Sequence, residues 1–281
     1  MNRPRLVMVH AGGIGDFILT LPALRALSAD WRIDLAGRTE RLELARAAGW
    51  AKAVRSLEGS GFESLFGTPD DRARSFFGSA DRVVVWMRDS DGVLRDALAA
   101  CGATDLVIEP GLPPDDYGSH ASQYYWERLG LPGEAPPPFL PVPPTDAGCE
   151  VVLHPGSGST TKNWPLEHFE SVARALEQDG LRVTWISGPA EIERGLAVTG
   201  ADATPSLVDL AAKLAGARLY LGNDSGITHL AAAVMCPTVA VFGPTDPAVW
   251  GPRGDRVRIV VERPWPDKER VLAAARELLG R

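Results

Sequence analysis

Apolar runs and helical spacing alternate from one end of the chain to the other. Short apolar runs at 5–10 (RLVMVH) and 82–87 (RVVVWM) predict buried strands, and apolar residues three and four apart at 17–27 predict a helix. Further strands are expected at 33–36, 53–57 and 105–109, and further helices at 41–48, 92–100 and 119–129. Regular alternation of strand and helix indicates βαβ units around a parallel sheet.

A proline-rich segment, 132–144 (PGEAPPPFLPVPP), interrupts this alternation with seven prolines in 13 residues. Such a run cannot fold as a helix or a central strand and acts as a semi-rigid spacer. The alternation then restarts, with strands at 150–154, 182–187, 219–221, 238–242 and 257–261 and helices at 165–178, 191–198, 207–215 and 268–279. The fold class is therefore α/β, with two Rossmann-like, doubly wound domains, 1–145 and 146–266, facing each other across a cleft.

Composition narrows the class of protein. The chain has 281 residues, 45% of them hydrophobic, and a net charge of −7, which argues against nucleic acid as a partner. Its three cysteines (Cys101, Cys149, Cys236) lie far apart and no pair of histidines has ligand spacing, so we expect neither a disulfide framework nor a metal site. No secretory segment and no run of roughly 18 apolar residues is present, which predicts a cytoplasmic protein.

The stretch 220–243 (YLGNDSGITHLAAAVMCPTVAVFG) is the most informative segment. It predicts a strand, a tight turn, an alanine-rich helix and a second strand. Backbone N–H groups at such a turn point beyond the strand's carboxyl end and form an anion site, which diphosphates commonly occupy. The candidate donor-binding residues here are Asn223, Asp224, Ser225, Gly226, Thr228 and His229.

A glycine-rich turn, 11–16 (AGGIGD), follows the first strand and opens the first helix. The dinucleotide fingerprint needs a third glycine, but position 18 is Ile, so the evidence for NAD binding is weak. Two interpretations remain open. The turn is structural, with Asp16 as the helix N-cap, or Gly13 and Gly15 let the backbone approach a ligand while Asp16 acts as a general base.

Two further loops follow strands of the second domain. In 154–165 (HPGSGSTTKNWP), Gly156 and Gly158 keep the loop thin, Ser157 offers a hydroxyl, and Lys162 is one of only four lysines among 29 basic residues. A lysine suits a phosphate or a leaving-group oxygen, although it could be a solvated loop residue. In 187–193 (SGPAEIE), Gly188 precedes Glu191 and Glu193. Either carboxylate could bind a ribose, or could only stabilise the helix's first turn. Together with His154, these loops are expected to contact one nucleotide.

The chain resembles glycosyltransferase family 9, the heptosyltransferases that build the inner core of lipopolysaccharide. The matching stretches are GGIGDFILTLPALRAL (12–27), VVLHPGSGSTTKNWPLEHF (151–169), ISGPAEIE (186–193) and YLGNDSGITHLAAAVMCPTVAVFGPTDP (220–247). The resemblance implies a GT-B fold and an inverting, metal-independent transfer from a nucleotide-sugar donor, typically ADP-heptose. It also implies a saccharide or glycolipid acceptor and peripheral contact with the inner membrane surface.

The resemblance also implies roles for single residues. Asp16 matches the catalytic base, Lys162 the lysine near the donor phosphates, and Glu191 or Glu193 the acid that binds ribose. Asp224, Ser225, Gly226 and His229 match the family's D-[ST]-G-x-x-H segment. Region 58–80 falls where the acceptor-side loops lie, and the terminal helix, 267–281, is expected to pack back on the first domain after Pro264 and Pro266. A non-catalytic nucleotide-sugar-binding protein and an NAD-dependent oxidoreductase remain alternatives.

Overall fold

The computed structural model describes residues 3–145, 150–188, 192, 200–202 and 206–281. The chain forms two compact units: unit 1 is Met1–Tyr117 with Ala121–Pro136, and unit 2 is Gly118–His120 with Pro137–Arg281. The boundary therefore falls inside the proline-rich segment and not after residue 145. The reason is that the backbone beyond Pro137 already pairs with unit 2, since Leu140 N donates to Ala233 O at 2.8 Å and Thr145 N to Ala212 O at 3.1 Å.

Unit 1 is built on a parallel sheet of five strands in the order β3-β2-β1-β4-β5. Its strands are β1 (Arg5–His10), β2 (Arg32–Gly37), β3 (Ala53–Arg55), β4 (Arg82–Trp86) and β5 (Leu106–Glu109). The central strands are buried on both faces, as their apolar runs predict. The chain builds outward from β1 in both directions, so the strand order reverses between β1 and β4.

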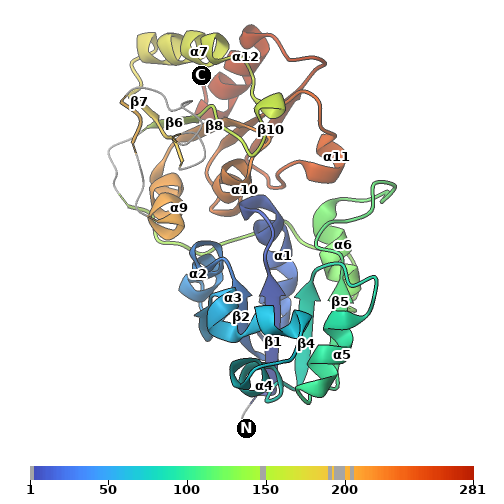
Figure 1. Ribbon diagram of the computed structural model, residues 1–281. Coiled ribbons are helices and arrows are strands. Elements are labelled where there is room, and N and C mark those ends of the chain that lie inside the picture. Colours follow the sequence, from blue (N-terminus) through green and yellow to red (C-terminus); the bar gives the residue numbers. More distant parts are fainter. Residues whose placement is uncertain (1–2, 146–149, 189–191, 193–199, 203–205) are drawn as a thin grey trace. The chain divides into compact units, whose positions relative to one another are not determined.

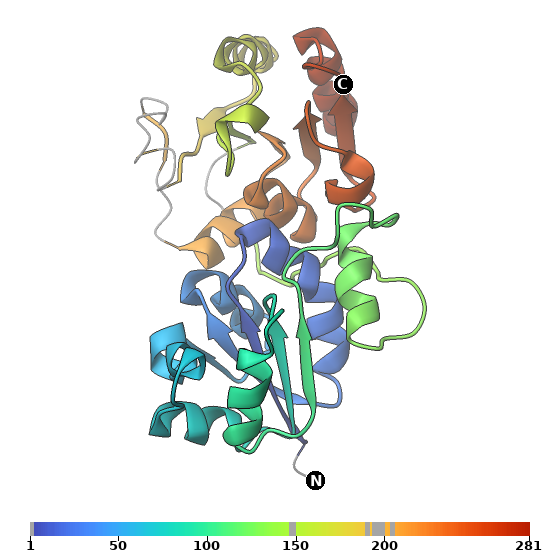
Figure 2. The ribbon, with the colours of Figure 1, turned by 45° about the vertical axis from the view of Figure 1, so that its right-hand side comes forward.

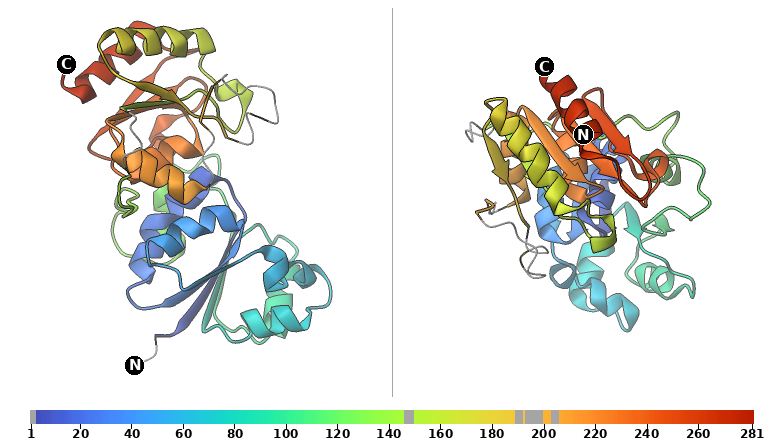
Figure 3. Two further views of the ribbon diagram at one scale, coloured as in Figure 1. Left: turned by 90° about the vertical axis from the view of Figure 1, so that its left-hand side faces the viewer. Right: turned by 90° about the horizontal axis from the view of Figure 1, so that it is seen from above.

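Helices cover both faces of this sheet (Figures 2 and 3). They are α1 (Ile14–Leu27), α2 (Thr39–Ala47), α3 (Leu57–Ser60), α4 (Asp71–Phe77), α5 (Val93–Ala100) and α6 (Ala121–Arg128), with the 3-10 helix η1 (Phe62–Phe66). Val7, Val9 and Val85 form a core with η1, α4 and α5 on one face. Helix α1 packs with α2 and α6 on the other (Figure 3). The doubly wound arrangement predicted for this unit is confirmed.

The stretch 57–77 contains more structure than its sequence suggests, because α3, η1 and α4 follow one another with short turns. Gly61 ends α3 in the left-handed conformation, with φ at +73°. A Cβ atom at this position would lie 2.5 Å from Asp70 Oδ1 and 2.6 Å from Ala73 N, so only glycine lets α3 and α4 approach so closely. Helices this short carry too little periodicity to be recognised from their sequence.

Unit 2 repeats the architecture with a parallel sheet in the order β10-β9-β8-β6-β7. Its strands are β6 (Val151–His154), β7 (Val183–Trp185), β8 (Leu219–Asn223), β9 (Thr238–Phe242) and β10 (Val257–Val261). In register, Tyr220 of β8 stands opposite Val152 of β6 and Thr238 of β9. Here the strand order reverses between β6 and β8. A sheet of this kind binds ligands beyond the carboxyl ends of the strands at such a reversal.

The helices of unit 2 are α7 (Leu166–Gln178), α9 (Leu207–Gly216), α10 (Gly226–Ala233), α11 (Pro247–Trp250) and α12 (Lys268–Leu279), with the 3-10 helix η2 (Thr160–Lys162). Helix α7 buries Phe169, Val172 and Leu176 against the sheet, at helical spacing. Helices α9 and α10 pack together, and α7 and α12 lie on the opposite face of the sheet (Figure 1). The helix expected at 191–198 lies outside the described residues except for Ile192.

The prediction that the terminal helix leaves the second domain is wrong. Val271 and Ala275 of α12 are fully buried in the core of unit 2, together with Leu153, Leu221 and Phe169. Helix α12 therefore covers the sheet of unit 2 beside α7, because its apolar face completes the layer that α7 begins. Among the described residues, no helix is long and apolar enough to cross a membrane.

Candidate functional site

In unit 1 the candidate site is the turn that follows β1, at the reversal of strand order. Gly13, not Asp16, is the N-cap of α1, and Asp16 is the third residue of the helix. The Asp16 carboxylate accepts a hydrogen bond from Gly13 N at 2.7 Å (Oδ2) and so stabilises the helix start from within the first turn. Gly15 lies inside the helix. One carboxylate oxygen is thus committed to the backbone.

Two residues beside this turn were not identified from the sequence. Arg41 of α2 donates from Nη1 to the Gly12 carbonyl. Burial lowers the pKa of Arg41, and the negative charge of the Asp16 carboxylate acts in the opposite direction. His10, at the end of β1, is 2% exposed and packs edge-on against Phe17 with ring centroids 5.3 Å apart. Burial, and then the charge of Arg41, lower the pKa of His10 from 6.5 to about 4, so the imidazole is neutral at physiological pH.

Gly12 has no side chain, so its backbone can lie close to the side chains of His10 and Asp16. A Cβ at Gly12 would lie 3.0 Å from His10 Cε1 and 3.2 Å from Asp16 Oδ2. On the other side of the turn, burial and then the Asp16 charge raise the pKa of Tyr125, whose hydroxyl donates to Gly111 O at 2.8 Å. The Asp16 carboxylate therefore belongs to a cluster with His10, Arg41 and Tyr125.

In unit 2 the loops after β6 and β8 meet at the reversal of strand order, and Asn223 ties them together. Its Oδ1 accepts from Trp164 N at 3.0 Å and its Nδ2 donates to Pro155 O at 2.7 Å. The Asn223 side chain is fully buried, so it holds the frame of the loop and is not available to a ligand. Thr228 is buried too, and its hydroxyl donates to the carbonyl of Asn223.

Lys162 and Asp224 form the charged centre of this site. Lys162 Nζ lies 2.7 Å from Asp224 Oδ2, and the Thr245 hydroxyl donates to the same oxygen at 2.8 Å. The Asp224 side chain is 8% exposed and that of Lys162 33% exposed, so the pair opens to solvent on the lysine side. The interpretation of Lys162 as a solvated loop residue does not agree with this ion pair.

The first turn of α10 lies next to this pair. Ser225 is its N-cap, and the Ser225 hydroxyl accepts from Thr228 N at 3.3 Å. The half-buried Gly226 is the first helical residue, and the N–H groups of a helix's first turn have no partner within the helix. Positive potential from these groups adds to the charge of Lys162, which makes this end of the sheet suitable for an anion.

His229 lies behind this turn and is 6% exposed. Burial lowers its pKa to about 4; Asp224 acts in the opposite direction, and His120 and Lys162 lower it further. His120 belongs to the segment 118–120 of unit 2, and its Nε2 lies 2.8 Å from Gly251 O. His229 is therefore a neutral imidazole in the wall of the site.

The remaining predicted residues take different places. Ser157 is buried, with its hydroxyl 2.5 Å from Ser159 O and 2.6 Å from Asn163 Oδ1, whereas a Cβ at Gly158 would meet nothing within 4 Å. His154 is buried, 3.4 Å from the hydroxyl of Tyr220, and Gly188 O accepts from Ile192 N at 3.1 Å. Glu191 and Glu193 lie outside the described residues. Gly156 lies in the same loop, directly after Pro155.

Within the part of the chain that the structure describes, no group of three or more His, Cys, Asp and Glu side chains could hold a metal ion. Among the described residues of these loops, Lys162 and Asp224 form the charged pair at the site, with the amides of α10 beside them.

Comparison with known proteins finds relatives of this chain in sequence and in fold. Residues 145–277 match the model of glycosyltransferase family 9 (heptosyltransferase). Lipopolysaccharide heptosyltransferase 1 of Escherichia coli (strain K12) is 37% identical over 123 residues, which cover 41% of this chain and 39% of that protein. Lipopolysaccharide heptosyltransferase 3 of the same strain is 34% identical over 113 residues, 36% of this chain and 33% of that protein. The chain thus matches about two fifths or less of the length of these relatives.

Solved structures resemble the whole chain in fold. A glycosyl transferase family 9 protein from Veillonella parvula gives a TM-score of 0.77 at 18% identity, covering 99% of this chain and 98% of that one. An E. coli heptosyltransferase solved with ADP gives 0.69 at 23% identity, covering 98% and 99%. These likenesses confirm the two-domain GT-B fold. The chain therefore shares the fold of heptosyltransferases over its whole length, and residues 145–277 resemble glycosyltransferase family 9 in sequence.

Proposed function

We propose that this protein is an inverting, metal-independent glycosyltransferase that moves a heptose or related sugar from an ADP-sugar to a saccharide acceptor. The acceptor belongs to the lipopolysaccharide core or to another glycan of the cell envelope. The observation that carries the proposal is the Lys162–Asp224 pair beside the first turn of α10, within the segment that matches the family. The cytoplasmic setting and an acceptor presented at the inner membrane surface rest on the resemblance to the family.

Donor binding is assigned to unit 2. The loops after β6 and β8 leave neighbouring strands at the reversal of strand order, where phosphates are commonly bound in such sheets. Lys162 is 33% exposed and able to turn from Asp224 towards a diphosphate. Relatives of this fold have been solved with ADP and with ADP-2-deoxy-2-fluoro heptose, which supports an adenine nucleotide donor here. Glu191 or Glu193 remains proposed for the ribose hydroxyls.

Proton transfer is assigned to Asp16. Its Oδ2 accepts from Gly13 N, which fixes the carboxylate at the end of β1, and its second oxygen is proposed to accept the proton of the acceptor hydroxyl. A positioned general base is typically worth about 10²–10⁴ in rate. Gly13 at the N-cap and Gly15 in the first turn of α1 present no side chain to the acceptor.

The reaction is a single displacement. Asp16 takes the hydroxyl proton, the acceptor oxygen bonds to the anomeric carbon, and the bond from that carbon to the diphosphate oxygen breaks, which inverts the configuration. Lys162 and the N–H groups at Ser225 and Gly226 stabilise the charge that develops on the leaving diphosphate. These groups take the place of a divalent cation, so transfer is expected to continue in the presence of EDTA.

Two variants test the assignment. Asp16→Asn keeps an oxygen for Gly13 N, so folding and ADP affinity are expected to stay unchanged while turnover falls by at least about 100-fold. Lys162→Ala is expected to weaken both ADP binding and turnover, because its charge faces the diphosphate before and during departure. Titration calorimetry with ADP and initial rates of sugar transfer give the two readouts.

Matched controls exist for both substitutions. Asp70→Asn changes another carboxylate that accepts from a backbone N–H at a helix start, and Lys213→Ala removes another lysine from an ion pair with an aspartate. Both controls are expected to retain turnover. If Asp16→Asn keeps full turnover, Asp16 is not the general base and only stabilises the start of α1. Tight binding of ADP-sugars without transfer or donor hydrolysis would favour a non-catalytic binding protein.

A further inference from the structure

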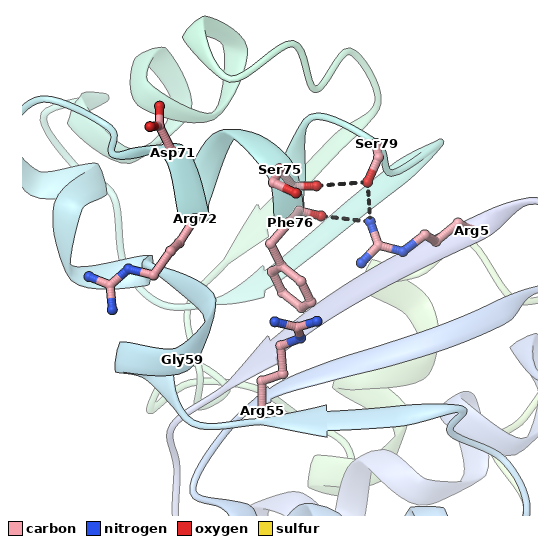
Figure 4. A pocket seen from close by; sticks show the side chains of 8 residues that line it. All are labelled: Arg5, Arg55, Gly59, Asp71, Arg72, Ser75, Phe76 and Ser79. Carbon is pink, nitrogen blue, oxygen red and sulfur yellow. Dashed lines mark hydrogen bonds between the residues drawn. The ribbon is translucent and has the colours of Figure 1, made fainter.

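We propose that unit 1 carries a second anion site, whose lining does not include the Asp16 turn, that binds a phosphomonoester. The site is a cavity of about 550 Å³ beside α4 and the end of β3, with Arg5, Arg55, Ser75 and Phe76 in its wall (Figure 4). Arg5 opens β1, whereas Asp16 follows the opposite end of that strand. The proposal is therefore independent of the sugar transfer proposed above.

Two guanidinium groups gather around one aromatic ring. The Cζ atoms of Arg5 and Arg55 lie 5.1 Å and 5.2 Å from the centroid of the Phe76 ring (Figure 4). The ring is buried, so its position is fixed, and its electron-rich faces attract cations. Phe76 thus holds two positively charged groups, contributed by strands β1 and β3, at one cavity wall.

Arg5 is oriented before any ligand arrives. Its Nε donates to Asp34 Oδ2 at 2.7 Å. Its Nη1 donates to Phe76 O at 2.6 Å and to Ser79 Oγ at 2.8 Å (Figure 4). Among the described residues, its other terminal nitrogen, Nη2, has no hydrogen-bond partner. Three bonds hold the side chain, so ordering it costs a ligand little conformational entropy.

Arg55 supplies the charge. It is exposed, and within the described ranges it makes no ion pair, only the contact with Phe76. By contrast, Asp34 balances Arg5, and Asp70 binds Arg72 at 2.8 Å on the rim. The attraction for an anion therefore comes mainly from Arg55, while Arg5 Nη2 contributes a directed donor.

The donors available in the cavity suit a phosphate group. A phosphomonoester presents three acceptor oxygens, which can bond to the Arg55 guanidinium, to Arg5 Nη2 and to the exposed Ser75 hydroxyl together. The cavity is larger than a phosphate, and Asp71 in its lining can accept hydrogen bonds from hydroxyls on the organic part. These features favour a small, hydroxylated phosphomonoester over a simple inorganic anion.

The test is a residue-resolved titration of the ¹⁵N-labelled full chain by NMR. Inorganic phosphate and glycerol 3-phosphate are added separately to millimolar concentration. The amides of Gly59, Ser75 and Ser79 are expected to shift saturably, with glycerol 3-phosphate the tighter of the two. Arg55→Gln is expected to weaken this binding about tenfold, the effect of one charge-assisted hydrogen bond. The matched control is Arg95→Gln, on an exposed arginine of α5 that does not line the cavity.

A second variant keeps the proposal falsifiable if Arg55→Gln alters local folding. Ser75→Asp places a carboxylate in the cavity from an exposed position and is expected to abolish the shifts, with an unchanged circular dichroism spectrum. The idea is overturned if these amides do not respond at millimolar phosphomonoester, or if Arg55→Gln responds like the wild type. Phosphate that binds near Lys162 shifts amides of unit 2 and not those of Gly59, Ser75 and Ser79. A negative result for the unit 1 cavity is therefore distinguishable from a negative result for the donor site.

Discussion

His10 shows how a single residue can impose a pH dependence on the fold. Both ring nitrogens are buried without a hydrogen-bond partner among the described residues, and the pKa is lowered to about 4. The unfolded chain, with a histidine pKa of about 6.5, binds more protons than the folded chain between these two values. The free energy of unfolding therefore falls as the pH drops from about 6.5 to about 4.

Replacing His10 by Phe is expected to stabilise unit 1 and to flatten this dependence. The change removes two unsatisfied polar atoms from the core, each of which costs about 1–3 kcal/mol. In the wild type, His10 lowers the free energy of unfolding by about 2 kcal/mol between neutral pH and about pH 5, and this loss is expected to be absent from the variant. Urea unfolding at the two pH values measures both effects. An unchanged pH dependence in the variant would show that His10 is hydrogen-bonded or charged in the folded protein.

Lys162 and Asp224 are expected to be coupled energetically as well as in space. Lys162→Met leaves the Asp224 carboxylate, 8% exposed, with the Thr245 hydroxyl as its remaining partner, which destabilises the fold. Asp224→Asn in the same chain removes that charge and recovers part of the loss. A double-mutant cycle by urea unfolding is expected to give a coupling energy of about 1–3 kcal/mol. Additive single-variant effects would mean that the pair is not formed in solution.

The sequence indicates some members of the site and conceals others for a physical reason. Asp224 directly follows β8, Asp16 lies in the first turn of α1, and Lys162 lies in the loop that joins β6 to α7, so their place at the sheet edge follows from chain order. Arg41 reaches Gly12 from α2, and Thr245 reaches Asp224 from beyond β9. Such contacts depend on how helices and loops fold back over the sheet, which hydrophobic periodicity does not encode.

At the scale of elements, helix α12 shows the limit of periodicity. Its apolar positions correctly predicted one buried face, but not which sheet that face covers. The observed partner is α7 and the sheet of unit 2, where Val271 and Ala275 complete the core. The parallel arrangement of the strands, in contrast, followed from the alternation of strand and helix in both units, because a βαβ crossover joins parallel strands.

Val271→Ala tests the place of α12. Removing two buried methyl groups is expected to lower the free energy of unfolding by about 2 kcal/mol. Val261→Ala is the matched control, because Val261 of β10 in the same unit is 40% exposed and its truncation is expected to change little. Urea unfolding of both variants gives the comparison. Equal effects would contradict burial of α12 in the core of unit 2.

At the scale of the whole molecule, the two units are expected to respond differently to nucleotide. ADP should slow amide hydrogen exchange in unit 2, at residues 154–164 and 222–229, because bound ligand stabilises the state that binds it. The Gly12–Asp16 turn of unit 1 should keep its exchange rate. Hydrogen exchange with mass-spectrometric readout, with and without saturating ADP, makes the comparison. Protection confined to Gly12–Asp16 would reverse the roles proposed for the units.

The amide of Asn223 separates the framework of the donor site from its specificity. By bonding to Pro155 and Trp164, it fixes both ends of the stretch 156–163 on the sheet. Changes of length in a loop with fixed ends cost little free energy, so this window, with Lys162 retained, can be exchanged without disturbing β6 or α7. New nucleotide preferences, whether arising by natural drift or by directed evolution, are therefore expected to accumulate between these two residues while Asn223 stays invariant.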